Sequence, residues 1–254
     1  MNWELINKLR RFCRTSWVKS IYFNFTMLPF RQAIHLPIIM TKYAYLYSLS
    51  GKIVLRDKPR FAMARIGYLA EDIVAPAETR NLLQIEGTWE LYDAVQLGVG
   101  SLLRIEKDAT LITEKNVRIG AQVKIICYDK IHICQNSSIT WESQIIDTSF
   151  HYIRNIADKS FQPLTDPIKI GANTWICNRS SIMKGVELPA NTIVASDSLC
   201  NKKYDIPEYS LLAGIPAKLV KTGIYRCSFQ EEEEIRADMK KQHNNKSDSI
   251  TYCN

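Results

Sequence analysis

The sequence predicts an all-β solenoid, in which short strands wind into stacked triangular coils. Two observations support this fold class. An aliphatic residue recurs every six positions over long stretches, and a small or β-branched residue follows it four positions later. Neither the period of 3.6 of an amphipathic helix nor the period of two of an ordinary strand explains a period of six. A fixed short period is the signature of a repeat architecture.

The repeat is clearest between residues 170 and 198. Its aliphatic positions are Ile170, Ile176, Ile182, Leu188 and Val194, and its small or β-branched positions are Thr174, Ser180, Val186, Thr192 and Ser198. An earlier block obeys the same rule, with Ile133, Ile139 and Ile145 followed by Ser137, Ser143 and Ser149. Further upstream the match is looser and the frame slips; the positions that fit are Ile85, Leu91, Leu97, Ile105, Leu111, Val117 and Val123.

Six residues make one side of a coil, namely a short strand and a tight corner, and three sides close a triangle. The aliphatic side chain fills the interior. The small residue lies near the corner, where a bulky side chain would clash with the coils above and below. Because each coil bonds only to its neighbours, the stack grows in one dimension. The solenoid domain is predicted to span residues 85–226.

The flanking segments are predicted to form an N-terminal cap and a C-terminal helix. Residues 1–84 combine a basic helix, residues 1–20, with a mixed region that caps the first coil and helps to shape an acceptor pocket. The basic helix has two interpretations: packing on the end of the solenoid, which is favoured, or docking on a membrane surface or a partner. Residues 227–254 start acidic and become basic, which suits the dipole of a helix that ends in a frayed tail.

One long segment interrupts the period, because Ile170 lies 25 positions after Ile145, and 25 is not a multiple of six. We expect residues 152–169 to form a loop that leaves the coil immediately after His151, which occupies the next position of the six-residue frame. Long excursions from a regular scaffold are frequently functional.

Composition narrows the class of protein. The net charge of +7 suits acidic partners such as nucleotides and phosphorylated cofactors, but the basic residues are dispersed, which disfavours nucleic-acid binding. The seven cysteines include no CxxC pair, so we interpret them as reduced thiols without a zinc knuckle. We recognise no signal peptide and no membrane-spanning segment, and we expect a cytoplasmic protein, with peripheral contact at the inner membrane surface through residues 1–20 as an option.

Three passages resemble the hexapeptide-repeat acyltransferases. Residues 170–176 (IGANTWI) are similar to the family's I-G-x-N-x-W-I, residues 212–220 (LAGIPAKLV) to its A-G-x-P-A-K-x-I ending, and residues 146–151 (IDTSFH) to its D-x-x-x-H segment. The resemblance covers roughly residues 85–226 and implies a left-handed parallel β-helix, against the usual right-handed preference of β-crossovers. It departs from the family pattern in three places: Cys177 in place of glycine, ASDS at residues 195–198, and a longer stretch at residues 201–205.

The resemblance implies an acetyl-CoA-dependent O-acetyltransferase that acts on a sugar hydroxyl of a cell-surface polysaccharide or its precursor. An imidazole accepts protons near neutral pH, so His151 is the candidate general base. Asp147 is the candidate that orients it, since residues four apart in a strand point to the same side. A turn residue that bonds its own backbone is an equally good interpretation of Asp147.

The resemblance also implies where acetyl-CoA binds. The candidate phosphate and adenine contacts are Lys202, Lys203 and Lys218, although for Lys203 a solvated surface lysine is the favoured interpretation. Trp175 is a candidate for the pantetheine channel or for packing at a coil corner, and backbone groups near Asn178 and Ser196 would hold the pantetheine arm. Family members are trimers, so the site would lie in a groove between the subunits of a homotrimer that also admits the carbohydrate acceptor.

Alternative functions remain open at this stage. A metal enzyme similar to γ-class carbonic anhydrases needs three histidines, whereas only His132 and His151 lie in the repeats, so no metal is expected. We interpret His132 as an outward-facing polar residue, because it follows core-facing Ile131. An N-acetyltransferase of a nucleotide-linked amino sugar would use the same base and donor. A non-catalytic solenoid that serves as an interaction module is the third alternative.

Overall fold

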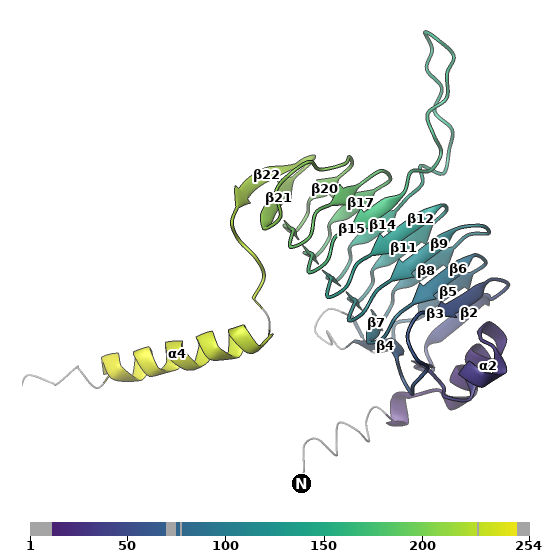
Figure 1. Ribbon diagram of the computed structural model, residues 1–254, viewed down its shortest axis with the longest axis horizontal. Helices are drawn as coiled ribbons and strands as arrows, with labels where there is room; N and C mark the ends of the chain where they lie inside the picture. Colours follow the sequence, from purple (N-terminus) through teal and green to yellow (C-terminus); the bar gives the residue numbers. More distant parts are fainter. Residues whose placement is uncertain (1–11, 70–74, 77, 228, 248–254) are drawn as a thin grey trace, which may run out of the picture. The chain divides into compact units, whose positions relative to one another are not determined.

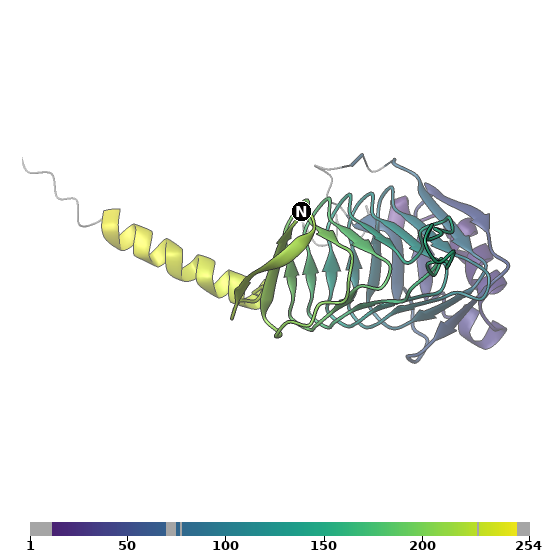
Figure 2. The ribbon, with the colours of Figure 1, turned by 90° about the horizontal axis from the view of Figure 1, so that it is seen from above.

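The computed structural model describes residues 12–69, 75–76, 78–227 and 229–247, and it shows three sheets that run side by side along a β-helix (Figures 1 and 2). The nine-stranded sheet contains, in spatial order, β1 (Ile38–Met40), β4 (Ala64–Leu69), β7 (Val95–Gly98), β10 (Arg118–Ile119), β13 (Ser138–Ile139), β16 (Trp175–Ile176), β19 (Ile193–Val194), β21 (Ser210–Gly214) and β22 (Ala217–Thr222). The seven-stranded sheet contains β2 (Ala44–Ser48), β5 (Asn81–Ile85), β8 (Leu102–Ile105), β11 (Lys124–Cys127), β14 (Gln144–Ile146), β17 (Ser181–Met183) and β20 (Leu199–Cys200). The six-stranded sheet contains β3 (Lys52–Leu55), β6 (Thr88–Leu91), β9 (Thr110–Thr113), β12 (Lys130–Ile133), β15 (Ile168–Ile170) and β18 (Glu187–Leu188).

Successive strands belong to successive sheets, so each coil contributes one side to each sheet, and the pairings between coils are parallel. The predicted solenoid is therefore confirmed as a left-handed parallel β-helix. Its core is built from columns of aliphatic residues in register. One column runs through the seven-stranded sheet and is fully buried; its members are Leu83, Leu103, Ile125, Ile145, Ile182 and Cys200. Cys200 thus fills an aliphatic position, as a small apolar residue does.

The small residues of the repeat are buried at the corners, as predicted, except Ser149, which lies in the segment that leaves the coil. Several of their hydroxyls satisfy backbone carbonyls of the next coil. Ser137 Oγ donates to Gly171 O (2.9 Å), and Ser143 Oγ donates to Cys177 O (3.0 Å). Both serines are buried. A larger side chain would displace the neighbouring coil, and an apolar one would leave a buried carbonyl without this partner.

A ladder of asparagines marks the corner between the six-stranded and nine-stranded sheets, which we call the asparagine corner. Its members Asn116, Asn136, Asn173 and Asn191 each adopt a positive φ between 55° and 59°. Asparagine tolerates this left-handed region better than most residues do. The side-chain amides of the first three donate to the asparagine of the next rung at 3.1 Å, and that of Asn191 donates to Glu208 at the same distance, so the same residue type closes the turn and links the coils.

The region before residue 85 contributes strands to all three sheets in addition to capping them. Strands β2, β3 and β4 pair in parallel with β5, β6 and β7, and β1 pairs in parallel with β4, although their sequence lacks the six-residue frame. Helices α2 (Trp17–Met27) and α3 (Phe30–Ala33) precede them. Buried Asn24 of α2 bonds both the N–H and the carbonyl of Ile38 (3.1 and 2.6 Å), which covers the open edge of β1. Most of the predicted basic helix, residues 1–11, lies outside the described residues.

The C-terminal end of the β-helix is closed by an antiparallel hairpin of β21 and β22. Residues 225–254 form a separate unit, whose described part contains α4 (Phe229–Ser247), the helix expected from the charge pattern. Among the helices of the described residues, none is long and apolar enough to cross a membrane.

Candidate active site

The interruption of the repeat forms a hairpin that protrudes from the β-helix between β14 and β15 (Figure 1). Antiparallel bridges pair Thr148 with Thr165 and Arg154 with Phe161. The chain therefore leaves the coil at Thr148, three residues earlier than expected. His151 lies in the hairpin stem and is exposed, so its predicted interior position in the coil is wrong. The chain thus departs into the hairpin before the next six-residue side is complete.

The base of the hairpin is fixed by Lys184, which follows β17 in the next coil. Its ammonium donates to Ser149 Oγ (3.2 Å) and to Pro163 O (2.5 Å), one on each strand of the stem. The Ser149 hydroxyl also lies 3.1 Å from the carbonyl of His151. Sequence reasoning missed Lys184. The repeat frame could have identified it: Lys184 follows Ile182 by two residues, as Asp147 follows Ile145, so the two residues occupy equivalent positions in neighbouring coils.

Asp147 is fully buried, and its carboxylate is committed to the backbone. Oδ1 accepts from the N–H of Tyr128 (2.7 Å) and Oδ2 from the N–H of Asp129 (2.9 Å), in the turn between β11 and β12. Burial raises the pKa of the Asp147 carboxyl, while the two N–H groups oppose this effect. Among the described residues no hydrogen bond joins Asp147 to the imidazole of His151, so the structure does not bring these two predicted catalytic groups together.

The imidazole of His151 takes part in none of the hydrogen bonds or ion pairs found between the described residues. Next to it in the stem, Phe150 packs edge-on against Tyr128, with ring centroids 5.6 Å apart. The guanidinium of Arg104, from β8, also lies over the Tyr128 ring, at 5.2 Å from its centroid. The stem that carries the exposed His151 is thus anchored through Phe150 to a cluster of two aromatic rings and a guanidinium.

Two of the three lysines of the predicted cofactor site, Lys202 and Lys203, follow β20 on the corner that carries the hairpin, where the chain leaves the seven-stranded sheet. Lys202 follows β20 at the position that Lys184 occupies one coil earlier, and its ammonium lies over the Tyr204 ring at 5.8 Å. Lys203 pairs with Glu187 at 2.5 Å. The hydrogen bond and charge of Glu187 raise the pKa of Lys203, and both side chains remain largely exposed. Lys218 is exposed on β22, beyond the last coil.

The other cofactor candidates lie on a different corner, where the chain passes from the nine-stranded to the seven-stranded sheet. Trp175 is half-buried in β16. Asn178 and Ser196 occupy equivalent places in two successive coils, and Ser196 Oγ donates to Asn178 Oδ1 at 2.7 Å. Within one chain the predicted cofactor residues thus lie in separate places, and of these only Lys202 and Lys203 share a corner with His151.

Comparison with known proteins agrees with this architecture. The chain is 25% identical over 222 residues to an uncharacterized 24.8 kDa protein in the cps region of Klebsiella pneumoniae, covering 87% of this chain and 95% of that protein. It is 24% identical to a probable acetyltransferase of Mycobacterium tuberculosis, covering 94% of this chain and 67% of the relative. The crystal structure of the polysialic acid O-acetyltransferase OatWY superposes with a TM-score of 0.51 at 16% identity, over 73% of this chain and 91% of that one. No family model matches the chain.

These findings confirm the predicted resemblance to the hexapeptide-repeat acyltransferases. The protein is an acyltransferase built on a left-handed β-helix.

Proposed function

We propose that this acyltransferase transfers an acetyl group from acetyl-CoA to a hydroxyl of a cell-surface polysaccharide or its sugar precursor, with His151 as the general base. The observation that carries the proposal is the exposed imidazole of His151 in the stem of the one long excursion from the coils between β5 and β20. An imidazole that no neighbour engages is available to a substrate hydroxyl. General acid–base catalysis needs such a group within hydrogen-bond reach of the proton that it removes.

In the proposed reaction, a ring nitrogen of His151 accepts the proton of the sugar hydroxyl while the hydroxyl oxygen attacks the thioester carbonyl. The tetrahedral intermediate then collapses, the carbon–sulfur bond breaks, and the imidazolium returns its proton to the sulfur of CoA. Asp147 and Lys184 act as positioning residues in this scheme. Asp147 holds the turn beside the start of the hairpin, and Lys184 ties its two strands together.

The aromatic cluster at the stem that carries His151 supports a carbohydrate acceptor. Tyr128 and Phe150 offer ring faces and edges there, and Arg104 adds a positive charge that suits an acidic sugar. One solved structure with a similar fold is that of the polysialic acid O-acetyltransferase OatWY. A hydroxyl of an acidic sugar is therefore the first acceptor to test.

The proposed donor site spans two subunits of a homotrimer. Lys202, Lys203 and Lys218 would contact the phosphates and adenine of CoA, because lysines act as point charges for phosphate. Trp175, with backbone groups near Asn178 and Ser196, would line the pantetheine arm. Since these residues lie in separate places on one chain, a second subunit supplies the missing half of the groove.

The test measures acetyl transfer by the full chain to a panel of neutral sugars, acidic sugars and amino sugars. The reaction is monitored through the release of the free thiol of CoA. His151→Gln is expected to lower kcat by about 10²- to 10⁴-fold while CoA binding, measured by calorimetry, is retained. Gln162→Ala, an exposed change in the same hairpin, is the matched control and should leave the rate unchanged.

A near-normal rate in His151→Gln would refute the base assignment. Transfer only to amino groups would identify an N-acetyltransferase instead. A chain that binds no acyl-CoA would overturn the proposal in favour of a non-catalytic solenoid.

A further inference from the structure

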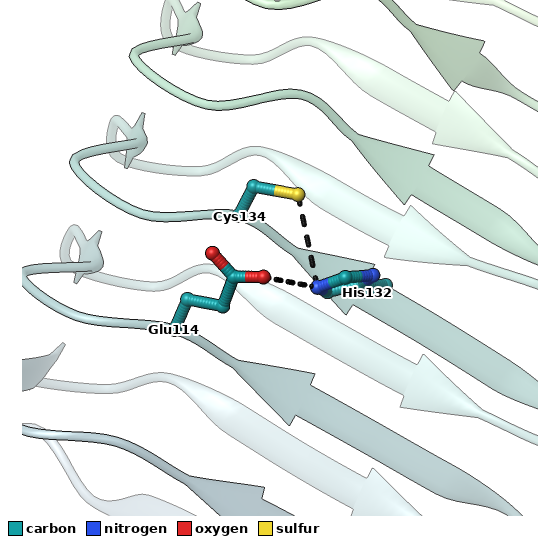
Figure 3. A group of neighbouring side chains, drawn as sticks. All are labelled: Glu114, His132 and Cys134. Atoms are coloured by element: carbon teal, nitrogen blue, oxygen red, sulfur yellow. Dashed lines mark hydrogen bonds and ion pairs between the residues drawn. The ribbon is translucent and has the colours of Figure 1, made fainter.

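A second cluster of reactive side chains lies on the outer surface of the six-stranded sheet, next to the asparagine corner (Figure 3). Glu114 follows β9, His132 lies in β12, and Cys134 is the residue just after β12. Glu114 Oε1 lies 2.7 Å from His132 Nε2, and Cys134 Sγ lies 3.7 Å from the same nitrogen. One ligand atom from each residue falls within 4.8 Å of the other two.

The geometry does not suit a nucleophilic cysteine. In a relay of thiol, imidazole and carboxylate, the thiol and the carboxylate use different ring nitrogens of the histidine. Here both groups approach Nε2, as ligands do around a common centre. Burial, followed by the charge of Glu114, raises the pKa of the Cys134 thiol to about 11, which is the opposite of activation.

The same geometry suits a small divalent metal ion with a preference for sulfur and nitrogen. Ligand distances of about 2.1 Å to nitrogen and 2.3 Å to sulfur place tetrahedral neighbours about 3.6 Å apart. The separation of Cys134 Sγ from His132 Nε2, 3.7 Å, matches that edge. The oxygen of Glu114 has to retreat from 2.7 Å to about 3.4 Å, which its flexible side chain permits.

The surroundings leave a coordination position open and help to balance the charge. The side chains of His132 and Glu114 are 26% and 27% exposed, so solvent reaches the cluster and supplies a fourth ligand. Lys169 lies directly opposite His132 in the ladder between β12 and β15 and brings a positive charge to this part of the sheet. Glu114 Oε2 also accepts from the N–H of Gln135 (3.0 Å), which fixes the orientation of the carboxylate.

We propose that Glu114, His132 and Cys134 form a zinc site that joins two successive coils of the β-helix. The thiolate, imidazole and carboxylate are the ligand types that Zn²⁺ takes in proteins. The cluster lies at the end of β12 away from the corner that carries His151, so the ion stabilises the solenoid and does not serve the proposed acetyl transfer. The sequence alone predicts no metal and does not group these residues, because Glu114 and His132 are 18 residues apart and meet only through the stacking of coils.

The test is metal binding by the full chain after it has been stripped with a chelator. One equivalent of Zn²⁺ is expected to bind and to raise the melting temperature. Co²⁺ is expected to give the charge-transfer absorption of a cobalt–thiolate bond and the visible bands of tetrahedral coordination. Cys134→Ser should abolish the thiolate band and weaken Zn²⁺ binding at least about tenfold. Glu114→Gln, which keeps an acceptor for Gln135, should weaken binding without loss of the thiolate band.

Cys177→Ser is the matched control, because this cysteine is also half-buried in the β-helix but lies outside the cluster. It should bind both metals as the unmodified chain does. The proposal is overturned if the unmodified chain binds no stoichiometric Zn²⁺, or if Cys134→Ser and His132→Ala bind it with unchanged affinity.

Discussion

Replacement of Asp147 by alanine tests whether this carboxylate is a structural part of the β-helix. The side chain is fully buried and accepts two backbone N–H groups, at 2.7 and 2.9 Å. A buried donor without an acceptor costs about 1–3 kcal/mol, so two cost about 2–6 kcal/mol. Alanine also removes the desolvation cost that raises the pKa of this carboxyl, so we expect the lower part of the range, about 2–4 kcal/mol.

The assay is thermal unfolding, monitored through the far-ultraviolet circular dichroism of the strands. For a chain of this size, a loss of 2–4 kcal/mol lowers the melting temperature by roughly 4–16 °C. Asp205→Ala, at an exposed aspartate of the same β-helix, is the control and should change it little. An unchanged melting temperature in Asp147→Ala, together with a collapse of acetyl transfer, would refute the structural role and restore the catalytic one.

The pH dependence of stability gives a second readout of the same group. Burial raises the folded-state pKa of Asp147 above the unfolded value of about 3.9. The stability that this shift contributes is fully present below the unfolded pKa and is lost as the pH rises through the folded pKa. The free energy of unfolding of the unmodified chain, relative to that of Asp147→Asn, is therefore expected to increase as the pH falls from about 7 toward about 4. A difference that does not vary with pH would contradict the assigned burial.

Two further predictions concern the hairpin and the spacing of the coils. Lys184→Met removes the bonds to Ser149 and Pro163, so kcat/KM for acetyl transfer should fall about tenfold or more through misplacement of His151. The free energy of unfolding should fall by only about 1–2 kcal/mol, and an unchanged transfer rate would show that the stem needs no such tie. Gly98→Ala would place a Cβ 2.4 Å from the carbonyl carbon of Gly120 in the next coil. Urea unfolding should show a loss of about 1–3 kcal/mol from overpacking, and unchanged stability would contradict the close approach of these coils.

Much of the fold could be predicted from the sequence because the repeat is a local rule. An aliphatic residue every six positions specifies which side chains point inward, and the small residue four positions later specifies the corner. The inward direction of Ile145, Ile182 and Cys200 within their own coils, and the buried positions of Ser137 and Ser143, follow from that rule. Strands β1 to β4 could not be predicted this way, because their place in the stack depends on pairing with later coils and on the cover provided by α2.

Part of the candidate site could likewise be predicted from the sequence, and part of it depends on contacts between coils. The sequence by itself determined that the frame breaks after Ile145 and that His151 lies at the break, since both follow from counting residues. Only the tertiary structure decided that Asp147 turns inward to the backbone of Tyr128 and Asp129, and that Lys184 ties the stem. It also brought Glu114 to His132, and it separated the corner of Trp175 from that of His151. The physical reason is that a period fixes the direction of each side chain within its own coil, whereas contacts between coils depend on the register in which the coils stack.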